Sequence, residues 1–271
     1  MGQLTAAGRT AVKHGAALWD RVRPGSPGIV ILIYHRVGAG RGGQMDLDPR
    51  EFRDQMASLA ATRRVIDLDT AALELASGGP VEPGVVVTFD DGTTDWVDHA
   101  MPALADADVP ATFYVATDFV EAGRPMPDGC PPISWAGLAE LQSTGLAAIG
   151  SHTHTHALLD RIQPAAAAAE LDRSIELIGE RLGSPPRHFA YPKALVASAE
   201  VEPLVRERFV TATVARTRPN VAGADLHRLT RSPIQPTDGE RFFLAKAGGG
   251  MHLEDDARDA LNRLRYRGAT R

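Results

Sequence analysis

Val85-Val86-Val87-Thr88-Phe89-Asp90-Asp91-Gly92 is the stretch around which the rest of this 271-residue sequence is organised. Its run of apolar, mostly β-branched residues predicts a strand that is buried on both faces, as in a parallel sheet. Two neighbouring carboxylates at the end of such a strand repel each other and resist burial. Taken alone, the stretch fits a strand that ends in a polar Asp-Gly turn.

A second polar stretch, Ser151-His152-Thr153-His154-Thr155-His156, also follows a short apolar run. Carboxylates and clustered histidines together are the ligands of divalent metal sites. His152 and His156 are four residues apart, so they project to the same side if the turn after the strand is helical. With Asp91 they would make a three-ligand site with an open position, the pattern of a catalytic metal centre. We expect His154 to point away from it.

The composition is that of an ordinary globular protein, with 44% hydrophobic and 23% charged residues. The length suits one large domain or two small ones. A net charge of -5 and a pI of about 6.0 give no sign of nucleic acid or an anionic membrane as partner. The single cysteine, Cys130, excludes an intrachain disulfide. Nothing in the sequence indicates an oligomeric state.

Residues 1–24 have scattered charges and lack the continuous apolar core and cleavage site of a signal peptide, so we expect a helix there. No stretch approaches the roughly 20 apolar residues that span a bilayer. These features predict a cytoplasmic protein with no transmembrane segment. A secreted or envelope-associated role stays open, because removal of a leader would leave the same sequence.

Apolar runs that predict strands alternate along the chain with stretches that predict helices, an order typical of parallel βα units closing into a sheet or barrel. The predicted strands are 29–34, 65–66, 85–89, 111–115, 146–149, 189–191 and 210–214, followed by an extended segment at 226–234. The predicted helices are 4–22, 49–61, 70–76, 96–107, 135–142, 164–182, 199–208 and 255–267. The Pro-rich stretch 117–132 is predicted to be a loop.

Polar residues stand at the ends of several predicted strands, namely His35, Asp90, Asp91, His152 and Lys193. Chemistry in parallel βα folds collects at the C-terminal ends of the strands, so the sequence predicts a single site. Asp91 would hold a metal while Asp90 takes a proton from metal-activated water, which predicts hydrolysis of an amide or ester. Zn²⁺ is expected, and such ligands also accept Co²⁺, Ni²⁺ or Mn²⁺.

The two motifs resemble those of the polysaccharide deacetylases of the NodB-homology type, carbohydrate esterase family 4. The family motif TFDDG stands unchanged at 88–92, and H-[S/T]-x-x-H stands at 152–156. The resemblance covers about residues 28–236 and includes the segments 34–36, 133–135, 149–151 and 226–231. It implies that Asp90 is the general base and that Asp91, His152 and His156 bind the metal.

The resemblance also implies an α/β fold, a distorted (β/α) barrel with about seven parallel strands. We expect this catalytic barrel to span residues 28–236. A helical extension at 1–27 would precede it, and a helical segment at 237–271 would follow and pack on it.

The third family motif departs from its common form F-R-x-P-Y-G and stands here as Phe-Ala-Tyr-Pro-Lys-Ala at 189–194. Its first four residues resemble a subgroup with F-A-Y-P. By resemblance, the backbone N–H of Lys193 donates to the oxyanion, and this donor survives a change of side chain. Ala194 replaces a glycine, which matters if the position needs a positive φ. Ala190 replaces the arginine that orients the base; we expect Arg231 to take over, the alternative being an exposed surface arginine.

The family's general-acid motif, Leu-x-His, is not evident near the C-terminus. His35 is the better-placed candidate for protonating the leaving amine, and a histidine hydrogen-bonded at the barrel rim is the alternative. Trp135 and Tyr191 are candidates for stacking on a sugar ring, although such residues more often belong to the core.

The leading hypothesis is a metal-dependent hydrolase that removes N-acetyl groups from amino sugars of a polysaccharide or glycoconjugate. A deformylase or another non-peptide C–N hydrolase acting on a small molecule is the second hypothesis, since one site geometry serves several amides. The third is a metal-binding or glycan-binding pseudoenzyme, which the changes at Lys193 and Ala194 and the missing acid motif suggest.

Overall fold

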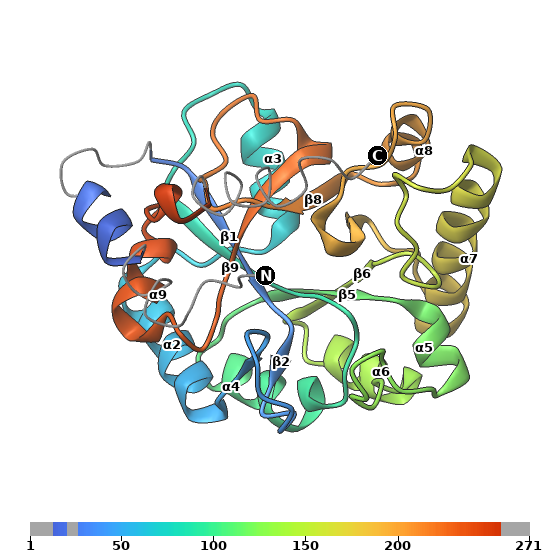
Figure 1. Ribbon diagram of the computed structural model, residues 1–271, viewed down its shortest axis with the longest axis horizontal. Coiled ribbons are helices and arrows are strands. Elements are labelled where there is room, and N and C mark those ends of the chain that lie inside the picture. The colour runs from blue at the N-terminus through green and yellow to red at the C-terminus, as the bar shows by residue number, and fades with distance from the viewer. Residues whose placement is uncertain (1–12, 21–26, 256–271) are drawn as a thin grey trace, which may run out of the picture.

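The computed structural model describes residues 13–20 and 27–255. Seven parallel strands close into a barrel in the order β1-β4-β5-β6-β7-β8-β9, and β9 returns to β1 (Figure 1). The strands are β1 (Ile29–Tyr34), β4 (Gly84–Phe89), β5 (Ala111–Val115), β6 (Ala147–Ser151), β7 (His188–Ala190), β8 (Thr211–Ala215) and β9 (Leu229–Pro233). The prediction of a barrel with about seven parallel strands is therefore confirmed.

The barrel is irregular at β7. This strand has three residues and pairs with β6 only through Ser151 and Phe189, whereas β1 and β4 pair along their full length. β7 ends at Ala190, which already belongs to the altered third motif at 189–194. The distortion therefore lies beside the predicted site.

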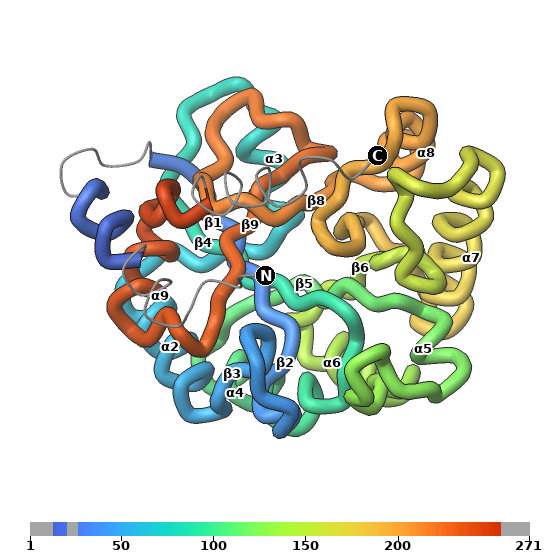
Figure 2. The backbone as a smooth tube through the Cα atoms, in the orientation of Figure 1, coloured from blue at the N-terminus to red at the C-terminus, as the bar shows by residue number. Residues whose placement is uncertain are grey.

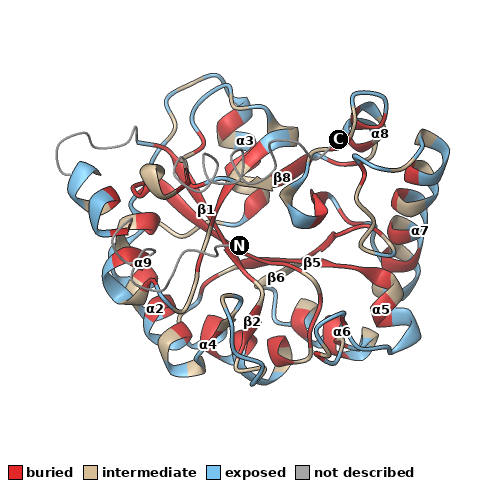
Figure 3. Cartoon of the chain, in the orientation of Figure 1, coloured by how far each residue is buried: buried red, intermediate tan, exposed pale blue. Residues whose placement is uncertain are grey.

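Helices surround the barrel, and their buried sides face the buried strands in Figure 3. They are α2 (Pro49–Thr62), α3 (Leu68–Ala76), α4 (Met101–Asp106), α5 (Thr117–Ala122), α6 (Trp135–Ser143), α7 (Pro164–Leu182), α8 (Glu202–Arg208) and α9 (Gly239–Ala247). The shorter elements are β2 (Arg36–Val37), β3 (Asp46–Leu47), η1 (Trp96–Ala100), η2 (Pro192–Ala194) and η3 (Leu226–Arg228).

The start of α2 shows how local sequence sets an element. The Asp48 side chain accepts hydrogen bonds from two backbone N–H groups of the first turn, and Pro49 occupies the first helical position. Phe52, Met56 and Leu59 line one face of the helix and are fully buried. The helix predicted over 49–61 is therefore confirmed.

Alternate residues of each strand face opposite sides of the barrel wall. Leu32 and Val87 belong to the large cluster packed under the surrounding helices. Their neighbours Ile31 and Val86 belong to a second cluster, which Leu68 and other residues of α3 join. This second set faces the barrel interior, and Asp90 continues it at the C-terminal end of β4.

Three predicted elements differ from the structure. The strand expected at 65–66 does not form, because Val65 makes only an isolated bridge to Val85. The stretch 117–132 was expected to be a loop, but it begins with α5, because Phe119 and Val120 are buried and Gly123 ends the helix with a φ of 62°. The expected single helix over 96–107 is a π-turn followed by α4. Pro102 stands at the start of α4, and its missing N–H accounts for the break.

The two ends of the described chain meet beside α9 (Figure 2). Residues 13–20 are helical, and the Lys13 ammonium lies 2.6 Å from Asp238 Oδ1. The Lys246 ammonium lies 3.0 Å from both oxygens of the same carboxylate. The helices expected over 4–22 and 255–267 lie partly outside the described residues, at 4–12, 21–22 and 256–267. The domain boundaries stay a prediction. Across the described ranges, no helix combines the length and apolarity needed to cross a bilayer.

Candidate active site

Asp90 and Asp91 follow β4 and turn to different partners. The Asp90 backbone N–H donates to the carbonyl of Tyr34 at 3.0 Å, which continues the β1–β4 pairing. Asp91 has a φ of 88°, an uncommon conformation for a residue with a side chain. The positive φ turns the chain so that the two carboxylates point apart. Asp90 faces Arg231, and Asp91 faces the histidines.

Asp91, His152 and His156 converge as the sequence predicts. Asp91 Oδ1 lies 3.8 Å from His152 Nε2 and 3.7 Å from His156 Nε2, and the three ligand atoms all lie within 4.8 Å of one another. His152 Nδ1 lies 2.7 Å from the carbonyl oxygen of Ala190. Because a carbonyl only accepts, Nδ1 donates its hydrogen to Ala190, and Nε2 is the ring nitrogen that faces Asp91.

The two histidines converge without the helical turn on which the argument from their spacing depended. Thr153 and His156 have φ angles of 64° and 63°, and the loop bends twice between the two ligands. Glu170 of α7 holds this loop by accepting hydrogen bonds from the backbone N–H groups of His154 and Thr155 at 3.1 and 2.8 Å. Sequence reasoning missed Glu170, because its role depends on how α7 packs on the loop.

His154 lies outside the ligand cluster, as expected. Its Nδ1 is 2.9 Å from the hydroxyl of Thr117 at the start of α5. The pKa of His156 is lowered to about 4 by burial and then by the charge of His152. The imidazole of His156 is therefore neutral near pH 7, with a lone pair free for a metal.

Arg231 reaches Asp90 from β9. Its Nη1 donates to Asp90 Oδ1 at 2.6 Å and its Nη2 to Oδ2 at 2.7 Å, while Nη1 also donates to the hydroxyl of Thr88 at 3.0 Å. Both charged side chains are buried. Burial by itself would raise the pKa of Asp90, but the charge of Arg231 and then that of His152 lower the pKa to about 2. Asp90 is thus ionised at neutral pH.

Arg36 is a site residue to which the sequence alone assigned no role. Its side chain is 5% exposed, and Nη2 lies 3.4 Å from Asp91 Oδ2 and 2.6 Å from Asp128 Oδ2. It therefore holds the Asp91 oxygen that faces away from the histidines. Its position directly after His35, in β2 just beyond the end of β1, was the available signal.

His35 lies at the same rim and is partly buried. Burial lowers its pKa, and the negative charges of Asp91 and Asp90 act in the opposite direction, so the ring lies within electrostatic reach of both carboxylates. The indole N–H of Trp96 donates to the His35 backbone carbonyl at 2.7 Å and anchors this turn. The general-acid role of His35 stays a prediction.

The sequence matches the family model described as polysaccharide deacetylase over residues 78–207, which contain both motifs. The solved structure of IcaB from Ammonifex degensii is 26% identical with a TM-score of 0.71, covering 82% of this chain and 98% of that chain. The family match and this likeness together identify a polysaccharide deacetylase domain in the chain. Its barrel is of the predicted NodB type.

Two further solved structures share the fold of this polysaccharide deacetylase domain. The Streptococcus pyogenes deacetylase PplD is 21% identical with a TM-score of 0.71, covering 82% of this chain and 99% of that chain. The Bacillus cereus polysaccharide deacetylase BC0361 is 23% identical with a TM-score of 0.70, covering 81% and 69%. No curated protein matches the sequence.

The altered third motif adopts a strained backbone. Lys193 and Ala194 have φ angles of 53° and 56°, and the Lys193 side chain is exposed. Consecutive left-handed residues that are not glycine are uncommon and occur mostly where surrounding structure holds them. The position at which the sequence departs from the family's glycine therefore does need a positive φ.

Ala194→Gly is expected to raise the free energy of unfolding by about 1 kcal/mol, because glycine adopts a positive φ without a Cβ clash. Urea unfolding measures the change. Ala57→Gly is the control, since Ala57 is exposed within α2, and it should lower stability by about 0.5–1 kcal/mol. Loss of stability in both variants would contradict the strain at residue 194.

Tyr191 and Trp135 were candidates for stacking on a sugar ring. Tyr191 is fully buried and packs edge-on against Phe189 at a centroid distance of 5.1 Å, so its ring offers no face to a substrate and the stacking role is wrong. Trp135 is partly buried at the start of α6, and its indole N–H donates to Glu121 Oε2 at 2.7 Å. A substrate role for Trp135 stays a prediction.

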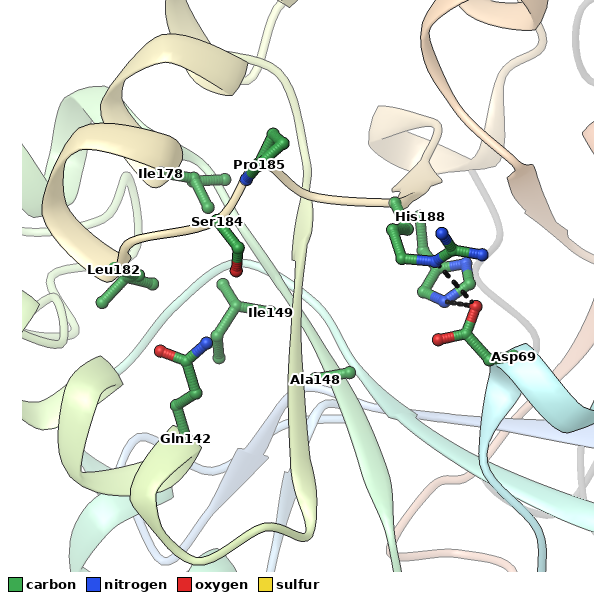
Figure 4. A pocket seen from close by; sticks show the side chains of 10 residues that line it. Asp69, Gln142, Ala148, Ile149, Ile178, Leu182, Ser184, Pro185 and His188 are labelled. Atoms are coloured by element: carbon green, nitrogen blue, oxygen red, sulfur yellow. Dashed lines mark hydrogen bonds and ion pairs between the residues drawn. The ribbon is translucent and has the colours of Figure 1, made fainter.

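A cavity of ≈ 150 Å³ lies at the other end of the barrel, where β6 and β7 begin (Figure 4). His188, Asp69 and Ile149 are among the residues that line it, and His188 Nε2 lies 3.4 Å from Asp69 Oδ1. None of the site residues described above lines this cavity. The cavity is therefore separate from the cluster of Asp91, His152 and His156.

Proposed function

We propose that this chain is a metal-dependent hydrolase that removes N-acetyl groups from amino sugars of a polysaccharide or glycoconjugate, with Asp90 as general base. One observation carries the proposal: two neighbouring carboxylates have separate environments. Asp91 joins two histidine nitrogens, whereas Asp90 is kept ionised beside them by Arg231. Such a division of tasks between two acids is how a hydrolase separates metal binding from proton transfer.

The donor set suits a divalent metal. One carboxylate oxygen and two imidazole nitrogens are the ligands of catalytic zinc sites, and Co²⁺, Ni²⁺ and Mn²⁺ accept the same atoms. The hydrogen bond from His152 to the Ala190 carbonyl and the contact of Arg36 with Asp91 orient two of the three ligands. Bound there, the metal would polarise the substrate carbonyl and acidify a water molecule.

The residues of the chain would handle the protons. Asp90 takes one proton from the attacking water, and its carboxylate oxygens retain lone pairs beyond those that Arg231 uses. The backbone N–H of Lys193 donates to the oxyanion that develops on the carbonyl oxygen. His35 gives a proton to the leaving amine nitrogen as the C–N bond breaks, so that acetate and a free amino sugar result.

The comparisons support an N-acetylated glycan as the substrate class. The matching family model is that of the polysaccharide deacetylases, and the structure of PplD was obtained in complex with acetate, the product that this reaction would release. We also propose that residues 189–192, Phe-Ala-Tyr-Pro, place the chain in the family subgroup with that form of the third motif.

The test is acetate release from N-acetylglucosamine oligomers by protein loaded with Zn²⁺ or Co²⁺, together with the stoichiometry of bound metal. His152→Ala is expected to weaken metal binding by more than about 100-fold, since loss of an outer partner alone costs roughly 10–100-fold. Its acetate release should fall in parallel. His154→Ala is the matched control and should keep metal and activity, because His154 faces Thr117.

Three results would contradict the proposal. Formate release from an N-formyl sugar without acetate release would indicate a deformylase. Stoichiometric metal binding with no release of either product would indicate a pseudoenzyme. Equal metal affinity in the wild type and in His152→Ala would mean that the three residues do not form the metal site.

A further inference from the structure

The Arg231 guanidinium contacts the Asp90 carboxylate at its edge and the Tyr114 ring at its face. Its Cζ lies over the ring of Tyr114, 5.2 Å from the ring centre, and the two side chains are 1% and 0% exposed. Arg231 Nε has no hydrogen-bond acceptor in the described part of the chain, whereas both Nη atoms donate to Asp90. The negative face of the Tyr114 ring is thus a partner for the part of this buried cation that no oxygen contacts.

The Tyr114 ring fits in the barrel only because the neighbouring strand has a glycine opposite it. Tyr114 and Gly150 are register partners in β5 and β6. A Cβ at residue 150 would lie 2.5 and 2.8 Å from two ring carbons of Tyr114, and 3.0 Å from the carbonyl oxygen of His188. Real Cβ atoms do not approach this closely, so any other residue at 150 would displace the ring.

We propose that Tyr114 is a positioning residue for the catalytic base: its ring supports Arg231, which orients Asp90, and Gly150 leaves the space that the ring needs. The proposal rests on the proposed role of Asp90. Neither Tyr114 nor Gly150 touches the substrate, and both act through Arg231. The orientation of the Asp90 carboxylate therefore depends on residues of β4, β5, β6 and β9, four of the seven barrel strands.

Ring support and simple space filling predict different results for the same variants. Leucine at 114 would leave an apolar side chain but remove the π face, so Arg231 could tilt away from Asp90. Phenylalanine would keep the face and lose only the hydroxyl. Alanine at 150 would push the ring aside, and a smaller residue at 114 would make room for that methyl group again.

The experiment measures kcat, KM, metal affinity and thermal stability for Tyr114→Phe, Tyr114→Leu, Gly150→Ala and the double variant Gly150→Ala/Tyr114→Leu. Tyr114→Leu should lower kcat by about 10- to 100-fold with KM and metal affinity unchanged, because small displacements of catalytic groups have effects of this size. Tyr114→Phe should keep kcat within about threefold, since the face that supports the cation remains. Gly150→Ala should lose stability, and the double variant should regain stability but not kcat.

Full kcat in Tyr114→Leu, or recovery of kcat in the double variant, would overturn the proposal and leave the proposed function intact. If the leucine variant does not fold, Tyr114→Met takes its place, because methionine adapts to irregular space. If the wild type releases no acetate, the proposed function fails. The contact between Tyr114 and Arg231 is then tested by the free energy of unfolding of the metal-free protein. A double-mutant cycle of Tyr114→Leu with Arg231→Lys should then show coupling, and additive effects would overturn it.

Discussion

Arg231→Met is expected to lower the free energy of unfolding by about 3–5 kcal/mol at neutral pH, because it leaves the Asp90 carboxylate buried without its partner. Both guanidinium Nη atoms now contact that carboxylate at 2.6 and 2.7 Å, and both side chains are buried. Acetate release should fall as well, by about 100-fold, since the base loses the group that orients it. Urea unfolding of the metal-free protein and initial rates measure the two effects.

The loss of stability in Arg231→Met should depend on pH. In the wild type the pKa of Asp90 is lowered from 3.8 to about 2, which corresponds to about 2 kcal/mol of stability. That contribution is fully present above about pH 4 and is lost as the pH falls toward 2, because the unfolded chain then binds the proton more readily. The stability gap between wild type and Arg231→Met should therefore narrow as the pH decreases.

Arg53→Met is the matched control, since Arg53 is exposed on α2. It should leave both stability and activity close to those of the wild type, because exposed charges contribute little. A loss of stability in Arg231→Met no larger than that in Arg53→Met would show that the buried pair does not stabilise the fold. A loss of stability that does not change between pH 7 and pH 3 would show that the ionised Asp90 carboxylate is not its cause.

Asp90→Asn is the second variant with a large expected effect. It should lower the rate of acetate release by about 10²- to 10⁴-fold, because asparagine keeps the shape of the side chain but cannot accept the proton. The stoichiometry of bound metal should stay that of the wild type, since Asp91, His152 and His156 remain. Metal analysis and single-turnover rates on the same preparation separate the two properties.

Asp98→Asn is the control for this substitution, because Asp98 is exposed in η1, a few residues further along the chain. It should leave the rate unchanged. An Asp90→Asn protein that keeps its rate within a few fold would exclude Asp90 as the base. An Asp90→Asn protein that loses its metal would instead place Asp90 among the ligands.

Local features were the most predictable part of this protein. The apolar run before Asp90 predicted β4, and the helix predicted over 49–61 is α2. These features depend on residues within a few positions of one another, so the pattern contains the information needed. The convergence of His152 and His156 with Asp91 was also predictable, because the two histidines are close in sequence and, like Asp91, follow a strand.

Burial and loop geometry were less predictable. Tyr191 was a candidate for stacking on a sugar because it is aromatic, but it is enclosed in an apolar cluster with Phe189. A helical turn would have brought His152 and His156 to one side, but positive φ angles at Thr153 and His156 bring the two side chains together instead. In both cases the outcome depends on what packs against the segment, and that partner comes from another part of the chain.

The sequence by itself determined the alternating strands and helices, the Asp-Asp and His-x-x-x-His motifs, and the side of the fold on which they meet. Only the tertiary structure decided what orients each of them. Arg231 lies 141 positions from Asp90 in the chain, and the space that Gly150 leaves for Tyr114 exists only through the register of β5 and β6. The physical reason is that closure of the barrel brings these strands together inside it, and no local pattern records which residues will then face each other.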